Sequence, residues 1–288
     1  MLTHWAGVRR VRALTVVTLV AGLASTVFGP LAALLEGLGT WRTAYLLLAV
    51  PLATTVAAHW WGLADPWQPV TPPAEGDGVA ASRLLRTPAF VLLVVAFTLA
   101  GFCVYAAVVN LVPLLTDSGL SAMVAAVALG LGGAGQVAGR LVYARALEPV
   151  PVRVRTVLVV AAAGAATLGL ALTARWALAV CAVSFAAGLA RGVFTLIQAT
   201  AVSDRWGTRD FGQRSAVLTG AVMVAAAFAP WLGALLASLV GGYDLAFVVV
   251  AVAGGVSAVV LAGLPSPSPA TSQQVAKSSG PEDRSDST

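Results

Sequence analysis

The sequence predicts an all-α integral membrane protein with about eight transmembrane helices. Of its 288 residues, 59% are hydrophobic and 10% are charged, whereas soluble domains carry about a quarter charged residues. Eight apolar segments each reach the ~20 residues that a helix needs to cross a bilayer. None of them shows the sustained period-two alternation of a transmembrane barrel strand, so helices are favoured.

The spans follow one another with short polar connections. The first follows Arg9, Arg10 and Arg12 and is too long for the apolar core of a cleaved signal peptide. The proline-rich segment 65–87 predicts a linker, and the polar segment 265–288 predicts a disordered tail. The predicted spans are 11–35, 44–63, 88–115, 121–144, 152–173, 177–203, 212–240 and 245–264.

Basic residues predict the orientation. Between the spans, only Arg42 and Arg175 would lie on the outer side, and the loops of the opposite side carry many more arginines. Cytoplasmic loops retain positive charge, so we expect a multi-pass protein of the cell membrane with both termini in the cytoplasm. The net charge of +5 therefore reflects topology and does not indicate nucleic acid. Tryptophans lie at span ends, as in an interfacial belt: Trp41, Trp60, Trp61, Trp176 and Trp206.

Residues 28–45 resemble residues 228–247, which suggests an internal repeat. The alternative is coincidence between two apolar helix ends of similar composition. A real repeat would make the unit six helices long, so that the chain holds the last two helices of one unit and all six of the next. The matched pairs are Phe28 with Phe228, Pro30 with Pro230, Leu35 with Leu235, Gly39 with Gly241, Ala44 with Ala246 and Tyr45 with Phe247.

Three motifs, taken with this organisation, resemble the major facilitator superfamily of secondary transporters over residues 12–264. Segment 29–34 resembles the Gly-Pro-x-x-Gly-Gly stretch of its drug:proton antiporters, with Ala33 and Leu34 in place of the glycines. Segment 135–141 resembles the turn between the eighth and ninth helices of the family. Tyr143 and Ala144 replace the Asp and Arg of the fuller gating signature there. Residues 204–207 resemble the charged turn after the tenth helix.

The resemblance implies a major-facilitator-type helical bundle whose first six-helix unit is incomplete. Residues 1–64 would hold its last two helices, 65–87 the cytoplasmic linker, 88–264 the six-helix C-terminal bundle and 265–288 the tail. The matching positions assign roles to two further sets of residues. Gly139, Arg140, Asp204 and Arg205 would belong to the cytoplasmic gating loops, and Gly29, Pro30, Pro230 and Gly233 to helix packing.

Arg191 is the strongest candidate for a substrate-binding residue. It lies midway between Trp176 and Trp206, near the bilayer centre, where a charge costs ~2.5–3.5 kcal/mol on insertion scales. Thr195 and Gln198 follow on the same helical face. No carboxylate lies at comparable depth, which indicates an anionic substrate such as a carboxylate, or else a partner in helices outside this chain. The structural alternative is an arginine satisfied by backbone carbonyls.

Asn110, Tyr105 and Gln136 are further substrate-binding candidates, and the alternative for each is an interhelical hydrogen bond worth ~0.6 kcal/mol in a membrane. Segment 130–135 matches the dinucleotide pattern G-x-G-x-x-G. That motif needs a preceding strand, whereas this copy lies within a predicted span, where small residues favour close helix packing.

The predicted function is secondary active transport of a small solute by alternating access. No cofactor or metal is expected, and the coupling proton is left open. The expected partners are the lipid bilayer and a small-molecule substrate, with a monomer if the chain is full-length. The alternative is a truncated, non-transporting remnant, because four absent helices would leave half of the cavity unbuilt. An intramembrane enzyme is disfavoured, since the sequence has no nucleophile–base or metal pair.

Overall fold

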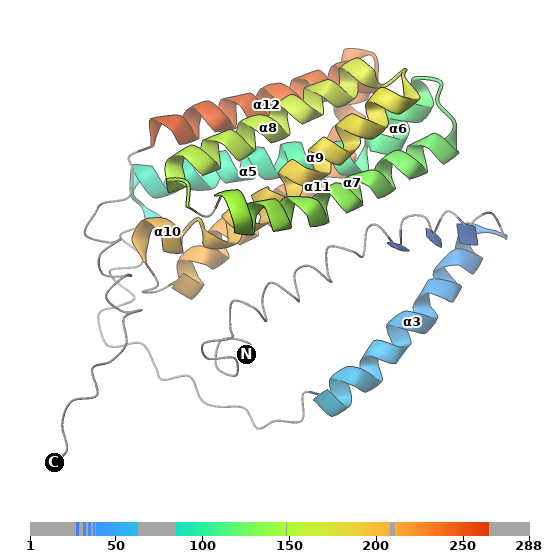
Figure 1. Ribbon diagram of the computed structural model, residues 1–288, viewed down its shortest axis with the longest axis horizontal. Helices are drawn as coiled ribbons and strands as arrows, with labels where there is room; N and C mark the ends of the chain where they lie inside the picture. Colours follow the sequence, from blue (N-terminus) through green and yellow to red (C-terminus); the bar gives the residue numbers. More distant parts are fainter. Residues whose placement is uncertain are drawn as a thin grey trace.

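The described part of the chain consists of helices joined by turns and short connections, and it has no strands (Figure 1). The computed structural model describes residues 27–28, 31–32, 34–35, 37, 39–62, 85–147, 149–207 and 211–264. Within them, seven helices are long and apolar enough to cross a membrane, so the predicted all-helical membrane architecture is confirmed. The first predicted span lies outside the described residues except near its end, as do most of the linker and all of the tail.

The helices follow the predicted spans closely. The span predicted at 152–173 coincides with α8, and the other described spans agree within a few residues at most ends. In chain order the elements are α3 (Trp41–Gly62), α5 (Pro88–Val109), α6 (Leu111–Asp117), α7 (Ala122–Val142), the π-helix η2 (Tyr143–Leu147), α8 (Val152–Thr173), α9 (Ala177–Thr200), α10 (Ser203–Trp206), α11 (Phe211–Val240) and α12 (Tyr243–Gly263).

The span predicted at 88–115 is two helices, which corrects the prediction of one. The helix α5 ends at Val109, and Asn110 leaves the helical conformation with φ −95° and ψ 8° before α6 begins. Pro113 provides the reason, because its ring would clash with the carbonyl of Val109 in a continuous helix. The chain therefore bends at Asn110.

Segment 135–141 resembles the family's turn motif but lies within a helix, in agreement with the span predicted at 121–144. This segment is helical, since α7 continues to Val142 and passes into the π-helix η2. The prolines that follow, Pro149 and Pro151, place the connection to α8 later in the chain, because proline cannot continue a helix. Arg140 consequently lies within a membrane helix and not in a loop.

The helices from α5 to α12 pack into one bundle, and α3 lies apart from it (Figure 1). In the bundle, α7 runs along α9, α8 along α12, and α5 contacts both α11 and α12. The rings of Phe97 and Phe194 stack in the main core with centroids 5.8 Å apart. In α3, by contrast, Ala44 is the only buried residue among those whose exposure is described.

Glycines bring the main chains of α7 and α9 into direct contact. A Cβ atom on Gly188 would lie 1.9 Å from the carbonyl oxygen of Gly132, and one on Gly192 would lie 2.1 Å from that of Gln136. No larger residue fits at either position without moving a backbone. The G-x-G-x-x-G pattern therefore lies within α7 and takes part in helix packing.

The two copies of the suspected repeat share a break between helices. Gly39 lies in the bend before α3, and Gly241 lies in the turn before α12 with a φ of +90°. Phe28 and Phe228 are both exposed, at 46% and 52%. Gly29 and Pro30 lie outside the described residues.

Candidate functional site

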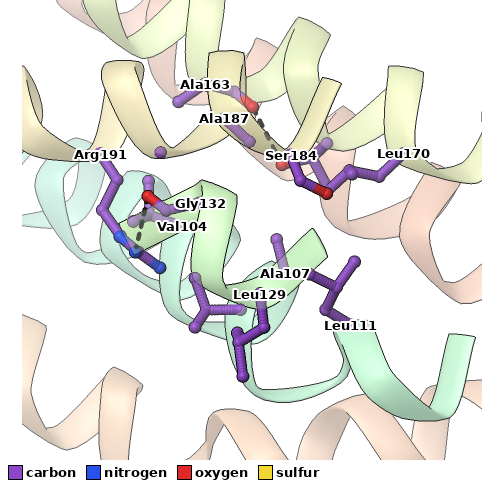
Figure 2. Close-up of a pocket in the computed structure, with 13 residues that line it drawn as sticks. Val104, Ala107, Leu111, Leu129, Gly132, Ala163, Leu170, Ser184, Ala187 and Arg191 are labelled. Carbon is purple, nitrogen blue, oxygen red and sulfur yellow. Dashed lines mark hydrogen bonds between the residues drawn. The ribbon is translucent and has the colours of Figure 1, made fainter. Parts of the chain in front are cut away.

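Arg191 lies in the middle of α9 and is buried, with 7% of its surface exposed. Its Nη2 donates to the carbonyl oxygen of Gly132 on α7 at 3.3 Å, and Figure 2 shows the side chain reaching across to that carbonyl. Its Nε is buried and has no hydrogen-bond partner. One neutral carbonyl thus accepts from only one of the N–H donors of the guanidinium, and the positive charge has no anionic partner among the described residues.

A small cavity of about 30 Å³ lies between α5, α7, α8 and α9, with Arg191 among its lining residues (Figure 2). Most of its lining is apolar, but Ser184 and Thr167 also face it. The Ser184 hydroxyl is buried without a partner, whereas that of Thr167 donates to the Ala163 carbonyl at 2.9 Å. This volume has room for one or two water molecules.

Ser184 was missed by the sequence reasoning, although a signal was present. It precedes Arg191 by seven residues, which is two helical turns, so both side chains lie on one face of α9. Thr167 gave no such signal, because it belongs to a different helix, α8.

The other predicted residues on α9 take separate positions. The hydroxyl of Thr195 donates to the carbonyl of Gly192 in its own helix at 2.9 Å. Gln198 is buried, at 7% exposure. Neither lines the cavity, so Arg191 is the one predicted α9 residue that does.

Asn110 joins two helices. Its Nδ2 donates to the Ala106 carbonyl at 3.0 Å and to the Ala229 carbonyl on α11 at 3.3 Å. Its amide is packed so closely against Gly233 that a Cβ there would lie 2.1 Å from Nδ2. These contacts fit the interhelical hydrogen bond that was the alternative interpretation of Asn110. Gly233 lies on α11, one turn after Pro230.

Tyr105 and Gln136 are both half-buried. Tyr105, on α5, lies within electrostatic range of both Arg191 and Arg140. Arg140 is half-buried near the end of α7, and its Nε and Nη1 are buried without hydrogen-bond partners. Arg140 and Arg191 also interact electrostatically with each other. Tyr105, Arg140 and Arg191 thus lie within electrostatic range of one another and come from three helices.

Asp204 and Arg205 lie at the arginine-rich end of the bundle, which we define by Arg153, Arg155, Arg205 and Arg214. Asp204 forms an ion pair with Arg155 and accepts a hydrogen bond from the Thr200 hydroxyl at 2.9 Å. Nothing in the sequence spacing links Arg155 to Asp204, so the sequence could not predict this pair.

Burial lowers the pKa of Arg205 to about 10, although the adjacent Asp204 carboxylate acts in the opposite direction. Arg205 therefore remains protonated at neutral pH and donates to the Ala201 carbonyl at 3.2 Å. Gly139, assigned to the same gating set from sequence, instead packs against Leu189 on α9.

The described architecture is that of a multi-pass helical membrane protein. The sequence matches the Major Facilitator Superfamily over residues 1–179 and again over residues 152–285. A search of the curated proteins finds no match. The chain belongs to the major facilitator superfamily, and it is a membrane transporter by that membership.

Proposed function

We propose that the chain is a secondary active transporter that carries a small anionic solute, with Arg191 as the central binding residue. The observation that carries this proposal is a buried guanidinium in mid-span whose Nε has no partner. Among the described residues, the carboxylates Asp117, Asp204 and Asp244 all lie at helix ends. An anionic solute would supply the charge that these carboxylates cannot.

A bound anion would compensate the energetic cost of burying the charge of Arg191. A charge at the bilayer centre costs ~2.5–3.5 kcal/mol on insertion scales, and a hydrogen bond within the membrane returns ~0.6 kcal/mol on average. The bond from Arg191 to Gly132 therefore leaves most of the cost in place. Charge-assisted hydrogen bonds to a carboxylate or phosphate are roughly twice as strong as neutral ones, so a bound anion would offset more of it.

Within this proposal, residues 88–264 form one six-helix unit, and residues 1–64 belong to its counterpart. The two would rock about a site near the bilayer midplane to expose it alternately on each side. We place the arginine-rich end in the cytoplasm of the cell, because cytoplasmic loops retain positive charge. Both termini then lie on that side, and 65–87 is the cytoplasmic linker.

Uptake by purified protein in liposomes tests the proposal. The assay compares labelled monocarboxylates, dicarboxylates and a neutral sugar under an imposed proton gradient. We expect Arg191→Ala to abolish anion uptake while the protein still inserts and elutes as one species. Arg175→Ala removes an exposed arginine at the opposite end and should leave uptake unchanged.

Two results would count against the proposal. Unchanged uptake by Arg191→Ala would remove Arg191 from the transport site. An absence of flux for every solute in the wild-type chain would favour the non-transporting remnant.

A further inference from the structure

A second arginine, Arg140, lies in the last turn of α7 and interacts electrostatically with Arg191. The helices α7 and α9 run in parallel, since Gly188 faces Gly132 and Gly192 faces Gln136. This register places Arg191 about level with residue 135 of α7. Arg140 is then about five residues further along, or ~7.5 Å of helix rise, a separation that two arginine side chains can bridge.

The two guanidinium groups have unused donors. The Nε of Arg191 and the Nε and Nη1 of Arg140 are all buried without a hydrogen-bond partner. In the part of the chain that the structure describes, the ion pair found joins Arg155 to Asp204 and involves neither arginine. Two like charges thus lie within electrostatic range of each other, with unpaired donors on both.

Resting on the function proposed above, we infer that the solute is a small dianion bound between Arg140 and Arg191. Each guanidinium can bind an oxyanion through two parallel N–H hydrogen bonds. A monoanion would leave one of the two charges uncompensated, whereas a dianion neutralises both.

The two negative charges can lie on one tetrahedral centre or on two carboxylates, and the test separates these cases. Purified protein in detergent is titrated with sulfate, succinate, acetate and chloride at constant ionic strength, and binding is measured by calorimetry. We expect sulfate or succinate to bind at least about tenfold more tightly than acetate or chloride, a ratio that corresponds to ~1.4 kcal/mol. A preference for sulfate would indicate that both negative charges lie on one tetrahedral centre, and a preference for succinate would indicate that they lie on two carboxylates.

Substitutions at Arg140 test the role of the second charge. Arg140→Gln should reduce the preference for the dianion to about twofold while acetate binding is retained, and Arg140→Lys should restore part of the preference. Arg145→Gln, at an exposed arginine one turn later, is the matched control and should behave as wild type.

The inference is overturned if sulfate and succinate bind no more tightly than acetate, or if Arg140→Gln keeps the preference. Either result leaves the proposed function standing as long as Arg191→Ala still abolishes anion uptake. If the wild-type chain transported none of the solutes, the proposed function itself would be wrong.

Discussion

The helices α3 and α9 are similar in length and both are apolar enough to cross a membrane, yet their surroundings differ. They have 22 and 24 residues. In α9 ten residues are buried, whereas Ala44 is the one buried residue described in α3. The sequence of α3 has no glycine before Gly62, while α9 presents Gly188 and Gly192 to the backbone of α7. Apolar composition thus makes a membrane span, and small residues at defined positions select its partner.

The suspected repeat sharpens this contrast at one matched position. Phe247 in α12 is 2% exposed, and its counterpart Tyr45 in α3 is 70% exposed. In the suspected repeat, the two aromatic residues would occupy equivalent places. Phe247 packs in a core cluster, whereas α3 lies apart from the bundle (Figure 1), so the packing partners of each helix account for the difference in burial.

The largest effect is expected from filling the contact between α7 and α9. Gly188→Val would push a side chain into the Gly132 carbonyl, since a Cβ added at position 188 would lie only 1.9 Å from the carbonyl oxygen. Overpacking of this kind costs up to ~3 kcal/mol and sometimes more, so we expect a loss of about that size. The loss of stability is measured by thermal unfolding in detergent, in which unfolding exposes the buried Cys103 thiol to a labelling reagent.

The matched control for Gly188 is Gly255→Val, at an α12 position where a Cβ meets nothing within 4 Å. Its unfolding temperature should stay close to that of the wild type. Equal unfolding temperatures for both variants would show that the close approach of α7 and α9 does not stabilise the bundle.

An intermediate effect is expected at the matched aromatic pair. Phe247→Ala should destabilise the protein by roughly 2 kcal/mol, below the ~3–5 kcal/mol of a soluble core, because lipid is as apolar as the protein interior. Tyr45→Ala should change stability by less than about 0.5 kcal/mol, as exposed substitutions do. The same thiol-labelling assay compares them. A loss at Tyr45 as large as that at Phe247 would mean that α3 has a partner of its own.

The smallest effect is expected from a hydrogen bond between helices. Asn110→Ala removes the bond to the Ala229 carbonyl and should cost about 1 kcal/mol, within the ~0.6–1.7 kcal/mol measured for such bonds. Thr54→Ala is the control on α3, because its hydroxyl bonds within its own helix to the Pro51 carbonyl. If the two variants lost equal stability, the Asn110 bond would contribute nothing beyond a local contact.

Most of the span boundaries were predictable, because apolar length and flanking charge depend on local sequence alone. The break at Asn110 was harder to predict, since the effect of Pro113 falls on a carbonyl four residues earlier, inside an unbroken apolar run. The continuation of α7 through 135–141 agrees with the span predicted at 121–144, although the motif there resembles a turn. At Asn110 a local apolar pattern was outweighed by a constraint on the backbone.

The site was predictable in part for similar reasons. The depth of Arg191 follows from Trp176 and Trp206, which flank it in sequence. Its partner Gly132 depends on the register between α7 and α9, which no local pattern encodes. Thr195 shares a helical face with Arg191, but its hydroxyl bonds to the carbonyl of Gly192, a local bond that competes with outward contacts.

The backbone contact between α7 and α9 also limits what can move in the transporter. With carbonyl oxygens set directly against glycines, neither helix can slide along the other without a steric collision. We therefore expect the two helices to move together as one rigid body. In the proposed function, Arg140 and Arg191 would then keep the same spacing whichever side of the membrane the site faces, and that spacing would select solutes by the distance between their charges.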